Sequence, residues 1–218
     1  MRRLPQSHFV QGGVYHIYNR GNRKQDIFAS NKDYRRYLEK LKEYKNKHNI
    51  AILTYCLMPN HVHFLVRQNS PDPVSSFVQK LHTAYSMYFN KKYKQVGHIF
   101  QDRFKAKIVT KDEYIMHLSR YIHLNPVKLA QKLTSYIWSS YPTFLGIADD
   151  GITDTKFILS YFKRKNDSPK DVISAYRYFI REEKQDLEKI RSLIFEEEPL
   201  PKPLELALKT ISKHPSQK

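Results

Sequence analysis

Residues 50–67 read IAILTYCLMPNHVHFLVR and indicate both the fold and the chemistry of this chain. The first half, Ile50–Leu57, is apolar and strand-like, and the Met-Pro-Asn that follows it is a tight break. The second half, His61–Arg67, alternates as a strand does, so the stretch predicts a β-hairpin. Because neighbouring side chains of a strand point to opposite faces, we expect His61 and His63 on one face and the apolar residues between them on the other, against helices.

Strands and helices are also predicted on both sides of the hairpin. Val14–Tyr18 and Lys105–Val109 are expected strands, and Asp33 to about Lys47 is an expected helix that Ser30 or Asn31 could cap. A second helix follows Pro71-Asp72-Pro73, and its expected buried stripe is Val74, Phe77, Leu81, Ala84 and Tyr88. The T-x-x-E spacing of Thr110 and Glu113 predicts a capping box that begins a third helix, which ends near Leu124 because Asn125-Pro126 disfavours its continuation.

The order strand, helix, two strands, helix, strand, helix predicts an α+β fold with a split βαβ (ferredoxin-like) antiparallel sheet. With the helices on one face of this sheet, the other face is left free for a ligand. The turn Asp149-Asp150-Gly151 is the expected boundary between a main domain, residues 1–150, and a small helical C-terminal extension, residues 151–218. In the extension, Ser168-Pro169 is expected to begin a long charged helix that reaches about Ile194.

The formal charge of +17 is concentrated in the first part of the chain. Residues 1–150 hold 24 Lys and Arg against 10 Asp and Glu, whereas residues 151–218 hold 14 against 11. The cations alternate with tyrosines and phenylalanines, so we expect nucleic acid as the partner, with bases stacked on aromatic rings and phosphates held by cations. The sequence has no apolar run of membrane-spanning length, no signal-peptide pattern at its start and a single cysteine, Cys56. We therefore expect a cytoplasmic protein with no membrane partner and no disulfide framework.

Two imidazoles side by side on a strand are a natural beginning of a divalent metal site. His61 and His63 have this arrangement if the hairpin forms, although a pair of exposed surface histidines would have the same spacing. A structural zinc site is not expected, because Cys56 is the only cysteine that could contribute a soft ligand.

The predicted third helix supplies a candidate nucleophile and a further metal ligand. His117, Tyr121 and Asn125 are four residues apart and form one polar stripe on a helix. A tyrosine phenol can attack a phosphate when a metal neutralises the developing charge. The amide oxygen of Asn125 could complete the ligand set of such a metal at the end of the helix.

Two other residues of the predicted helix, Tyr114 and His123, are less suited to these roles. Tyr114 is the rival nucleophile on roughly the same face, but its neighbour one turn later is Leu118, which cannot bind a metal. Tyr121 is therefore the preferred nucleophile. His123 lies off the polar stripe and is expected to be structural.

Five segments of the chain resemble the single-tyrosine transposases of the HUH superfamily, and within it the REP-associated tyrosine transposases. The segments are Tyr18-Asn19-Arg20-Gly21-Asn22, Leu57-Met58-Pro59-Asn60-His61-Val62-His63, Gly97-His98-Ile99-Phe100-Gln101-Asp102-Arg103-Phe104-Lys105, Ser119-Arg120-Tyr121-Ile122-His123-Leu124-Asn125-Pro126 and Trp138-Ser139-Ser140-Tyr141. The resemblance spans roughly residues 10–146, which is nearly all of the basic part, and its motifs agree in order and spacing.

The resemblance implies a transposase that cleaves single-stranded or hairpin DNA and transfers strands through a 5′-phosphotyrosine on Tyr121. It also implies Mg²⁺ or Mn²⁺ bound by His61, His63 and Asn125, and no small-molecule cofactor. The expected DNA contacts lie in the first loop and around the fourth strand; they are Arg20, Asn22, Arg23, Lys24, Arg103, Lys105 and Lys107. Monomer and homodimer both remain open, as does the role of the extension.

Two alternative functions would use parts of the same sequence pattern. A replication-initiator or relaxase type of nickase would use the same chemistry, but it normally carries a further helicase or partner domain. A non-catalytic nucleic-acid-binding protein could use the same sheet, since exposed aromatic residues on a split βαβ sheet also bind RNA. Such a binder would keep its affinity in the presence of a chelator and leave the DNA uncut.

Overall fold

The computed structural model describes residues 8–181. Its strands are β1 (Val14–Arg20), β2 (Ile50–Met58), β3 (His61–Gln68) and β4 (Lys105–Val109). Its α-helices are α1 (Asn31–Lys47), α2 (Val74–Tyr93), α3 (Asp112–Leu124), α4 (Tyr141–Phe144), α5 (Thr155–Leu159) and α6 (Pro169–Arg181). Short 3-10 turns lie at η2 (Asn22–Lys24), η3 (Asn125–Lys128), η4 (Leu133–Ser135) and η5 (Ser160–Phe162).

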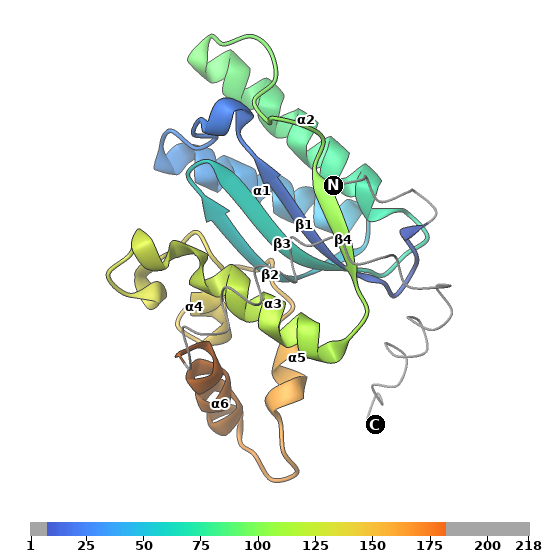
Figure 1. The fold of residues 1–218 in the computed structure, drawn as a ribbon, viewed down its shortest axis with the longest axis vertical. Coiled ribbons are helices and arrows are strands. Elements are labelled where there is room, and N and C mark those ends of the chain that lie inside the picture. Colours follow the sequence, from blue (N-terminus) through green and yellow to red (C-terminus); the bar gives the residue numbers. More distant parts are fainter. Residues whose placement is uncertain (1–7, 182–218) are drawn as a thin grey trace.

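The four strands form one antiparallel sheet in the order β2-β3-β1-β4. β2 and β3 are the predicted hairpin, and β1 lies between β3 and β4 (Figure 1). This is the predicted α+β, split βαβ arrangement, and the sequence pattern placed all four strands to within three residues at each end.

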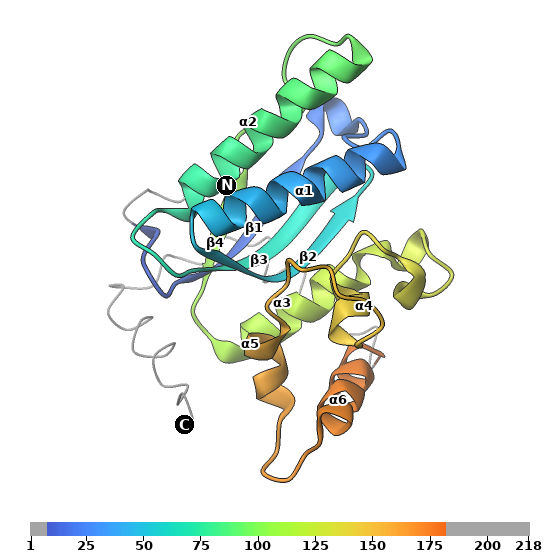
Figure 2. The same ribbon diagram turned by 180° about the vertical axis from the view of Figure 1, so that it is seen from behind.

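One face of the sheet is covered by α1 and α2, which lie in front of it in Figure 2. The residues of β3 that alternate with the histidines, namely Val62, Phe64 and Val66, are buried in this layer together with Tyr15 and Ile17 of β1. The alternation inferred from the sequence is therefore confirmed for the central strands.

Helix α1 begins with a capping box, in which Ser30 is the N-cap and Asp33 is the third helical residue. The Asp33 carboxylate is fully buried and also accepts hydrogen bonds from Lys92 Nζ at 2.5 Å, Tyr93 Oη at 2.7 Å and Tyr88 Oη at 3.0 Å. These three donors belong to α2, so one carboxylate both caps α1 and joins it to its neighbour.

The buried stripe of α2 differs from the predicted one in its second half. Val74, Phe77 and Leu81 are buried as expected, but further along the helix Tyr85 and Phe89 are buried in place of Ala84 and Tyr88. Tyr88 lies outside the buried stripe because its hydroxyl donates a hydrogen bond to Asp33. At 3.6 residues per turn, Tyr85 and Phe89 lie on the buried side of the helix instead.

The opposite face of the sheet was expected to be free, and this expectation is corrected by α3. Ile115, Leu118 and Ile122 of α3 are buried in a second core with Val14 of β1 and Leu65 of β3. The predicted Thr110–Glu113 capping box is also absent, because the N-cap is Lys111 and carries no side-chain cap. The helix thus starts one residue later than a box would require, although it ends at Leu124 as predicted.

The described part of the extension shares this second core. Ile158 of α5 and Tyr176 and Ile180 of α6 are buried in it, and Thr153 forms a parallel bridge to Ile52 of β2. The predicted start of the charged helix at Ser168-Pro169 is confirmed, but its predicted end near Ile194 lies outside the described residues. The division at residue 150 remains a prediction about the organisation of the chain.

A buried network connects the extension to α3. The Tyr176 hydroxyl lies 2.8 Å from His123 Nδ1, and His123 Nε2 lies 2.7 Å from the Ser140 hydroxyl. Burial lowers the pKa of His123 to about 3, so the ring is neutral and serves both hydrogen bonds. This confirms that His123 is structural: it fixes the helix that carries Tyr121 and that ends just before Asn125.

We expect Asp33→Asn to lower the free energy of unfolding by about 2 kcal/mol at pH 7, because the charged hydrogen bonds of the capping cluster are lost. Burial alone would raise the pKa of Asp33, but the hydrogen bonds from Lys92, Tyr93, Tyr88 and Ser30 lower it below its usual value. The carboxylate therefore stabilises the fold above the unfolded pKa of about 4, and this stabilisation is lost as the pH falls through the lower folded pKa.

Denaturant unfolding at pH 7 and at lower pH measures this difference. Glu39→Gln is the matched control, since Glu39 is an exposed carboxylate on the same helix that pairs only with exposed Arg36 among the described contacts. The control should leave stability almost unchanged at every pH. An Asp33→Asn protein as stable as the wild type at pH 7 would rule out the role given to the cluster.

Candidate active site

His61 and His63 lie at the start of β3, on the face away from α1 and α2. Their ring centroids are 5.1 Å apart and the rings are nearly perpendicular, at 88°. The β1 residues paired with them are Arg20 and Tyr18, respectively, so the same face of the neighbouring strand adds a cation and an aromatic ring. His63 is buried and His61 is half-buried.

Helix α3 brings Tyr121 to this pair. The Tyr121 ring lies edge-to-face on His63, with centroids 5.6 Å apart and an interplanar angle of 87°. Tyr121 lines a cleft together with both histidines, whereas Tyr114 packs against the second core beneath the ammonium group of Lys111. His117 also points elsewhere, since its ring packs near Phe179.

Asn125 follows the last residue of α3 and closes the site on the side of His61. Its Nδ2 donates a hydrogen bond of 2.9 Å to the Tyr121 carbonyl oxygen, so its Oδ1 faces the sheet. That oxygen lies 3.5 Å from His61 Nε2. The end of the helix thus places an amide oxygen beside one imidazole nitrogen of the pair.

The other nitrogen of each histidine ring is already occupied. His61 Nδ1 lies 2.6 Å from Asn60 Oδ1, which can only accept, so Nδ1 carries the proton and Nε2 the lone pair. His63 Nδ1 lies 3.0 Å from Nε2 of His16. Both rings are therefore held through Nδ1, and Nε2 of each remains as the candidate metal-binding atom.

His16 and Tyr18 of β1 belong to the site and were not identified from the sequence. The His16 ring stacks on His63, with centroids 5.3 Å apart and planes 9° apart, and on Tyr18 at 5.2 Å. The alternation of Val14, His16, Tyr18 and Arg20 along the predicted first strand is the signal that could have revealed them. It could be read only once β1 was known to lie beside β3.

Burial keeps the histidines of the site neutral. It lowers the pKa of His16 to about 3, with a further contribution from the positive charge of Lys107. The pKa of His63 is well below its usual value, through burial and then the neighbouring His16 and His61. The pKa of His61 is lowered by burial and by Arg20, against an opposing effect of Asn125. Neutral imidazoles are the form that binds a metal.

The pKa of Tyr18 is raised to about 12. Burial is the larger cause, and the negative charge of an ionised Tyr121 is the second. Both phenols line the same cleft. The ammonium group of Lys105 lies 5.9 Å from the centre of the Tyr18 ring, at the edge of the site.

The site opens into a cleft of about 480 Å³. Four of the predicted DNA contacts line it, and they are Arg20, Lys24, Arg103 and Lys105. Asn22, Arg23 and Lys107 are not among the residues that line it. Asp102 is the one acidic residue in the described wall, and the guanidinium of Arg20 donates two hydrogen bonds to neutral Gln101. The cleft is therefore basic overall and suits a phosphate backbone.

The side chains present fit a divalent cation. Nε2 of His61, Nε2 of His63 and Oδ1 of Asn125 are nitrogen and oxygen donors of the kinds that bind first-row divalent ions. Among the described residues no cluster of three or more His, Cys, Asp or Glu side chains forms a metal site. A cation would therefore depend on these three donors and take its other ligands from water and phosphate oxygens.

The comparisons with known proteins concern the family and the fold of this chain. Residues 9–125 match the family model described as "Transposase IS200 like". Sixteen solved chains match the structure, whereas no curated protein matches the chain. One solved structure is that of a REP-associated tyrosine transposase bound to a REP hairpin. It is 18% identical and aligns with a TM-score of 0.54, covering 71% of this chain and 92% of the other.

The structural likeness, at this identity, concerns the fold. The family match includes both histidines, Tyr121 and Asn125, and it spans more than half of the chain. No helix among residues 8–181 is long and apolar enough to cross a membrane. The resemblance drawn from the sequence motifs is confirmed at the level of the family: the protein belongs to the IS200-like transposases.

Proposed function

We propose that this transposase cleaves and rejoins single-stranded or hairpin-containing DNA through a covalent 5′-phosphotyrosine on Tyr121. The observation that carries the proposal is the meeting of Tyr121, His61 and His63 at one basic cleft, with Asn125 beside His61. The histidines and the tyrosine come from a strand and a helix that are about 60 residues apart in the sequence. Membership of a transposase family supports a DNA-cleaving activity.

Hairpin-bearing DNA of the REP type is the substrate class we propose. The solved relative of similar fold was bound to a REP hairpin, and the motifs of the present chain resemble the REP-associated subgroup. The cations along the cleft, Arg20, Lys24, Arg103 and Lys105, would hold the phosphates on either side of the cleaved bond.

In the cleavage step, the phenol oxygen of Tyr121 forms a bond to phosphorus and the bond from phosphorus to the 3′ oxygen breaks. The phenol proton passes to solvent, and the departing oxygen takes up a proton to become a free 3′-hydroxyl. Rejoining is the reverse: a 3′-hydroxyl attacks the phosphotyrosine and frees the phenol. Arg20 and Lys105 line the cleft, and we expect them to balance the negative charge that develops on the phosphate.

His61, His63 and Asn125 would hold Mg²⁺ or Mn²⁺, with Nε2 of each ring and the amide oxygen as ligands. When bound, the cation neutralises the phosphate oxygens and the charge of the transition state. His16 has a positioning role: for His63 Nε2 to keep its lone pair, His63 Nδ1 must carry the proton and donate to His16 Nε2.

Replacing the nucleophile should abolish covalent attachment. Tyr121→Phe removes only the phenol oxygen, so we expect no protein–DNA adduct on a labelled REP-type hairpin with Mn²⁺, while DNA affinity changes by less than about twofold because phosphate contacts dominate it. A denaturing gel detects the adduct. Tyr114→Phe on the same helix is the control and should form the adduct normally; an adduct on Tyr121→Phe would disprove the assignment.

Removing one imidazole should weaken metal binding directly. We expect His61→Ala to lower Mn²⁺ affinity by at least about tenfold in calorimetry, and a chelator to stop cleavage by the wild type. His98→Ala removes an exposed histidine outside the site and should leave Mn²⁺ affinity unchanged. Equal losses in the two variants would show that the cation does not bind at the histidine pair. Cleavage that continues in the presence of a chelator would show that the reaction needs no cation.

The role of His16 can be separated from a general effect on folding. His16→Leu removes the acceptor for His63 Nδ1–H, so Mn²⁺ affinity should fall by about 10- to 100-fold. His16→Gln can offer an amide oxygen to the same proton and should recover part of that loss. DNA affinity in chelator should stay near the wild-type value in both. If His16→Leu binds Mn²⁺ as tightly as the wild type, His16 does not position the ligand.

A further inference from the structure

The side chain of Asn60 lies between the first loop of the chain and the proposed metal ligand His61. It is half-buried and lines the catalytic cleft, but it is neither one of the proposed ligands nor one of the predicted DNA contacts. On one side its Oδ1 lies 2.6 Å from His61 Nδ1, and on the other its Nδ2 donates a hydrogen bond of 3.2 Å to the Lys24 carbonyl oxygen. Both ends of one amide group are thus engaged, one by the ligand and one by the loop.

The Lys24 carbonyl determines which end of the amide faces His61. A carbonyl oxygen can only accept a hydrogen bond, so the group that faces it must be the NH₂ group of Asn60. The amide oxygen then faces His61, and because it too can only accept, His61 Nδ1 must carry the proton. An amide turned by half a rotation would offer its NH₂ group to His61 Nδ1 and leave the proton of the ring on Nε2.

The proton of the His61 ring has a second acceptor within reach. Asn125 Oδ1 lies 3.5 Å from His61 Nε2, at the outer limit of a hydrogen bond. If the proton were on Nε2, this oxygen would accept it, and Nε2 would have no lone pair for a cation. The orientation of the Asn60 amide therefore selects between two hydrogen-bonded states of the site, of which only one can bind a metal.

The Lys24 carbonyl is placed by a tight loop. The Gly21 N–H donates to the Asn60 carbonyl at 2.8 Å, and the 3-10 turn η2 follows it. Arg23 and Lys24 both have positive φ, of 51° and 63°, a backbone region that residues other than glycine rarely adopt. A Cβ atom at Gly21 would lie 2.0 Å from the Gln25 carbonyl oxygen, so the loop can follow this path only with glycine there. The path of the loop keeps the Lys24 carbonyl opposite the amide.

We infer that Asn60 is a positioning residue: oriented by the Lys24 carbonyl, it holds His61 in the tautomer whose Nε2 is free for a cation. The inference deepens the proposed function, because it concerns a ligand of the proposed metal site. His16 has the corresponding role for His63, but it acts from the sheet. For His61 the controlling group belongs to a loop whose lysine side chain lines the catalytic cleft.

The tautomer of His61 can be measured directly, without metal, DNA or cleavage. In the metal-free, full-length protein with ¹⁵N-labelled histidines, the protonated and unprotonated nitrogens of a neutral ring have different chemical shifts, and the His61 signals are those lost in His61→Ala. We expect the wild type to carry the proton on Nδ1. Asn60→Ala removes the acceptor, so the proton should move at least partly to Nε2, and Mn²⁺ affinity should fall by about tenfold or more. Asn60→Asp keeps an acceptor and should retain both the tautomer and the Mn²⁺ affinity.

Gly21→Ala tests the role of the loop. The added methyl group must displace the chain at Gln25, and with it the neighbouring Lys24 carbonyl, so the Asn60 amide is free to turn. We expect a mixture of His61 tautomers and weaker Mn²⁺ binding. Combining Gly21→Ala with Asn60→Asp should restore the wild-type tautomer, because a carboxylate has no NH₂ group to turn toward the ring. This rescue separates the orientation of the amide from a general loss of structure.

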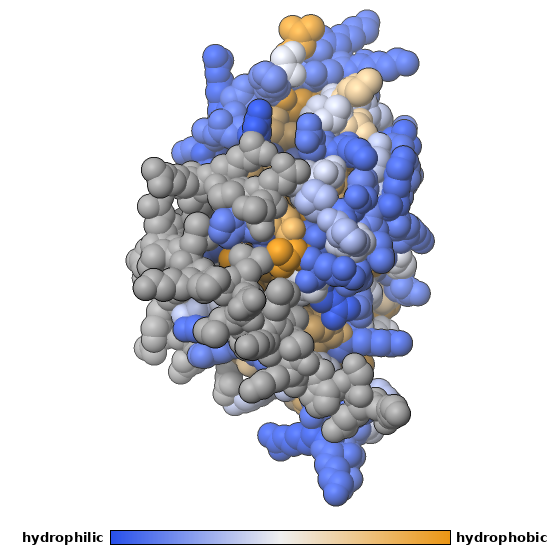
Figure 3. Space-filling model, turned by 90° about the vertical axis from the view of Figure 1, so that its right-hand side faces the viewer, coloured by the Kyte–Doolittle hydropathy of each residue, from blue (hydrophilic) through white to orange (hydrophobic). Residues whose placement is uncertain are grey.

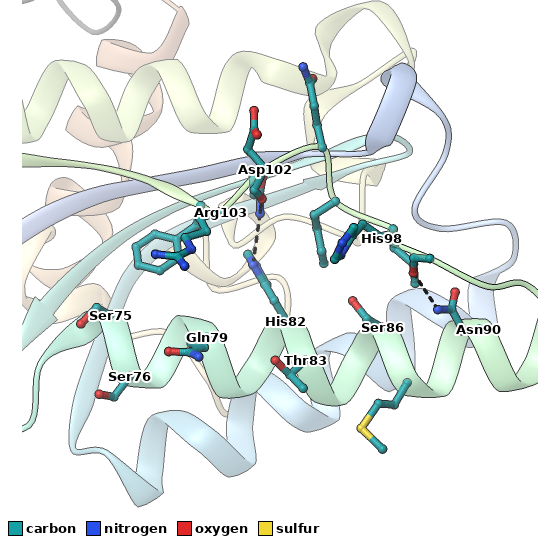
Figure 4. Close-up of a pocket in the computed structure, with 17 residues that line it drawn as sticks. Ser75, Ser76, Gln79, His82, Thr83, Ser86, Asn90, His98, Asp102 and Arg103 are labelled. Atoms are coloured by element: carbon teal, nitrogen blue, oxygen red, sulfur yellow. Dashed lines mark hydrogen bonds between the residues drawn. The ribbon is translucent and has the colours of Figure 1, made fainter. Parts of the chain in front are cut away.

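Asn90→Ala is the matched control. The Asn90 amide also donates to a loop carbonyl, that of Gly97, but Asn90 does not line the catalytic cleft (Figure 4). This variant should leave the His61 signals and the Mn²⁺ affinity unchanged.

Two results would overturn the inference and leave the proposed function standing. One is a wild-type tautomer in Asn60→Ala, and the other is a wild-type tautomer in Gly21→Ala. If the tautomers change as expected but the wild type binds no Mn²⁺, the role of Asn60 in setting the His61 tautomer is supported, and the proposed metal site fails instead.

Discussion

The core and the site both depend on the antiparallel pairing of β1 with β3. In the observed register Tyr18 faces His63 and Arg20 faces His61, which also brings His16 against the His63 ring. A shift of one residue would turn every side chain of β1 to the other face, so the pairing that builds the sheet also builds the site. The apolar alternation of Tyr15 and Ile17 holds this register, because a shift of one residue would turn both side chains out of the core that the sheet forms with α1 and α2.

The nucleophile depends on a second constraint, the packing of α3 on the sheet. Ile122 and Leu118 bury one side of the helix, and the neutral His123 ring joins it to Ser140 and to Tyr176 of the extension. With the helix fixed on this side, its polar edge delivers Tyr121 and Asn125 to the histidines. The described part of the C-terminal extension, residues 151–181, therefore contributes to the site through packing and adds no residue to the cleft.

The positive charge of the catalytic cleft matches the phosphate backbone that we propose it binds. Four cations line the catalytic cleft, and the coloured part of the face seen in Figure 3 is mostly hydrophilic with small hydrophobic groups. Inside the cleft the histidines are neutral because they are buried, so the positive charge comes from the lysine and arginine side chains that line it. This arrangement leaves imidazole lone pairs beside cationic side chains, which suits a metal and a phosphate at the same point.

The sequence alone determined the strands, the first three helices, the family and the residues proposed for the chemistry. These are local features: alternation, helical spacing, and motifs such as His61-Val62-His63 lie within a few residues and persist in any fold that keeps them. It did not determine the contribution of His16 and Tyr18, the covered second face of the sheet, or the contact of Asn60 with the Lys24 carbonyl. Each of these depends on which segments pack together over long sequence separations. Only the tertiary structure decides that packing, because burial and hydrogen bonding between distant segments fix a single arrangement out of many that the local patterns allow.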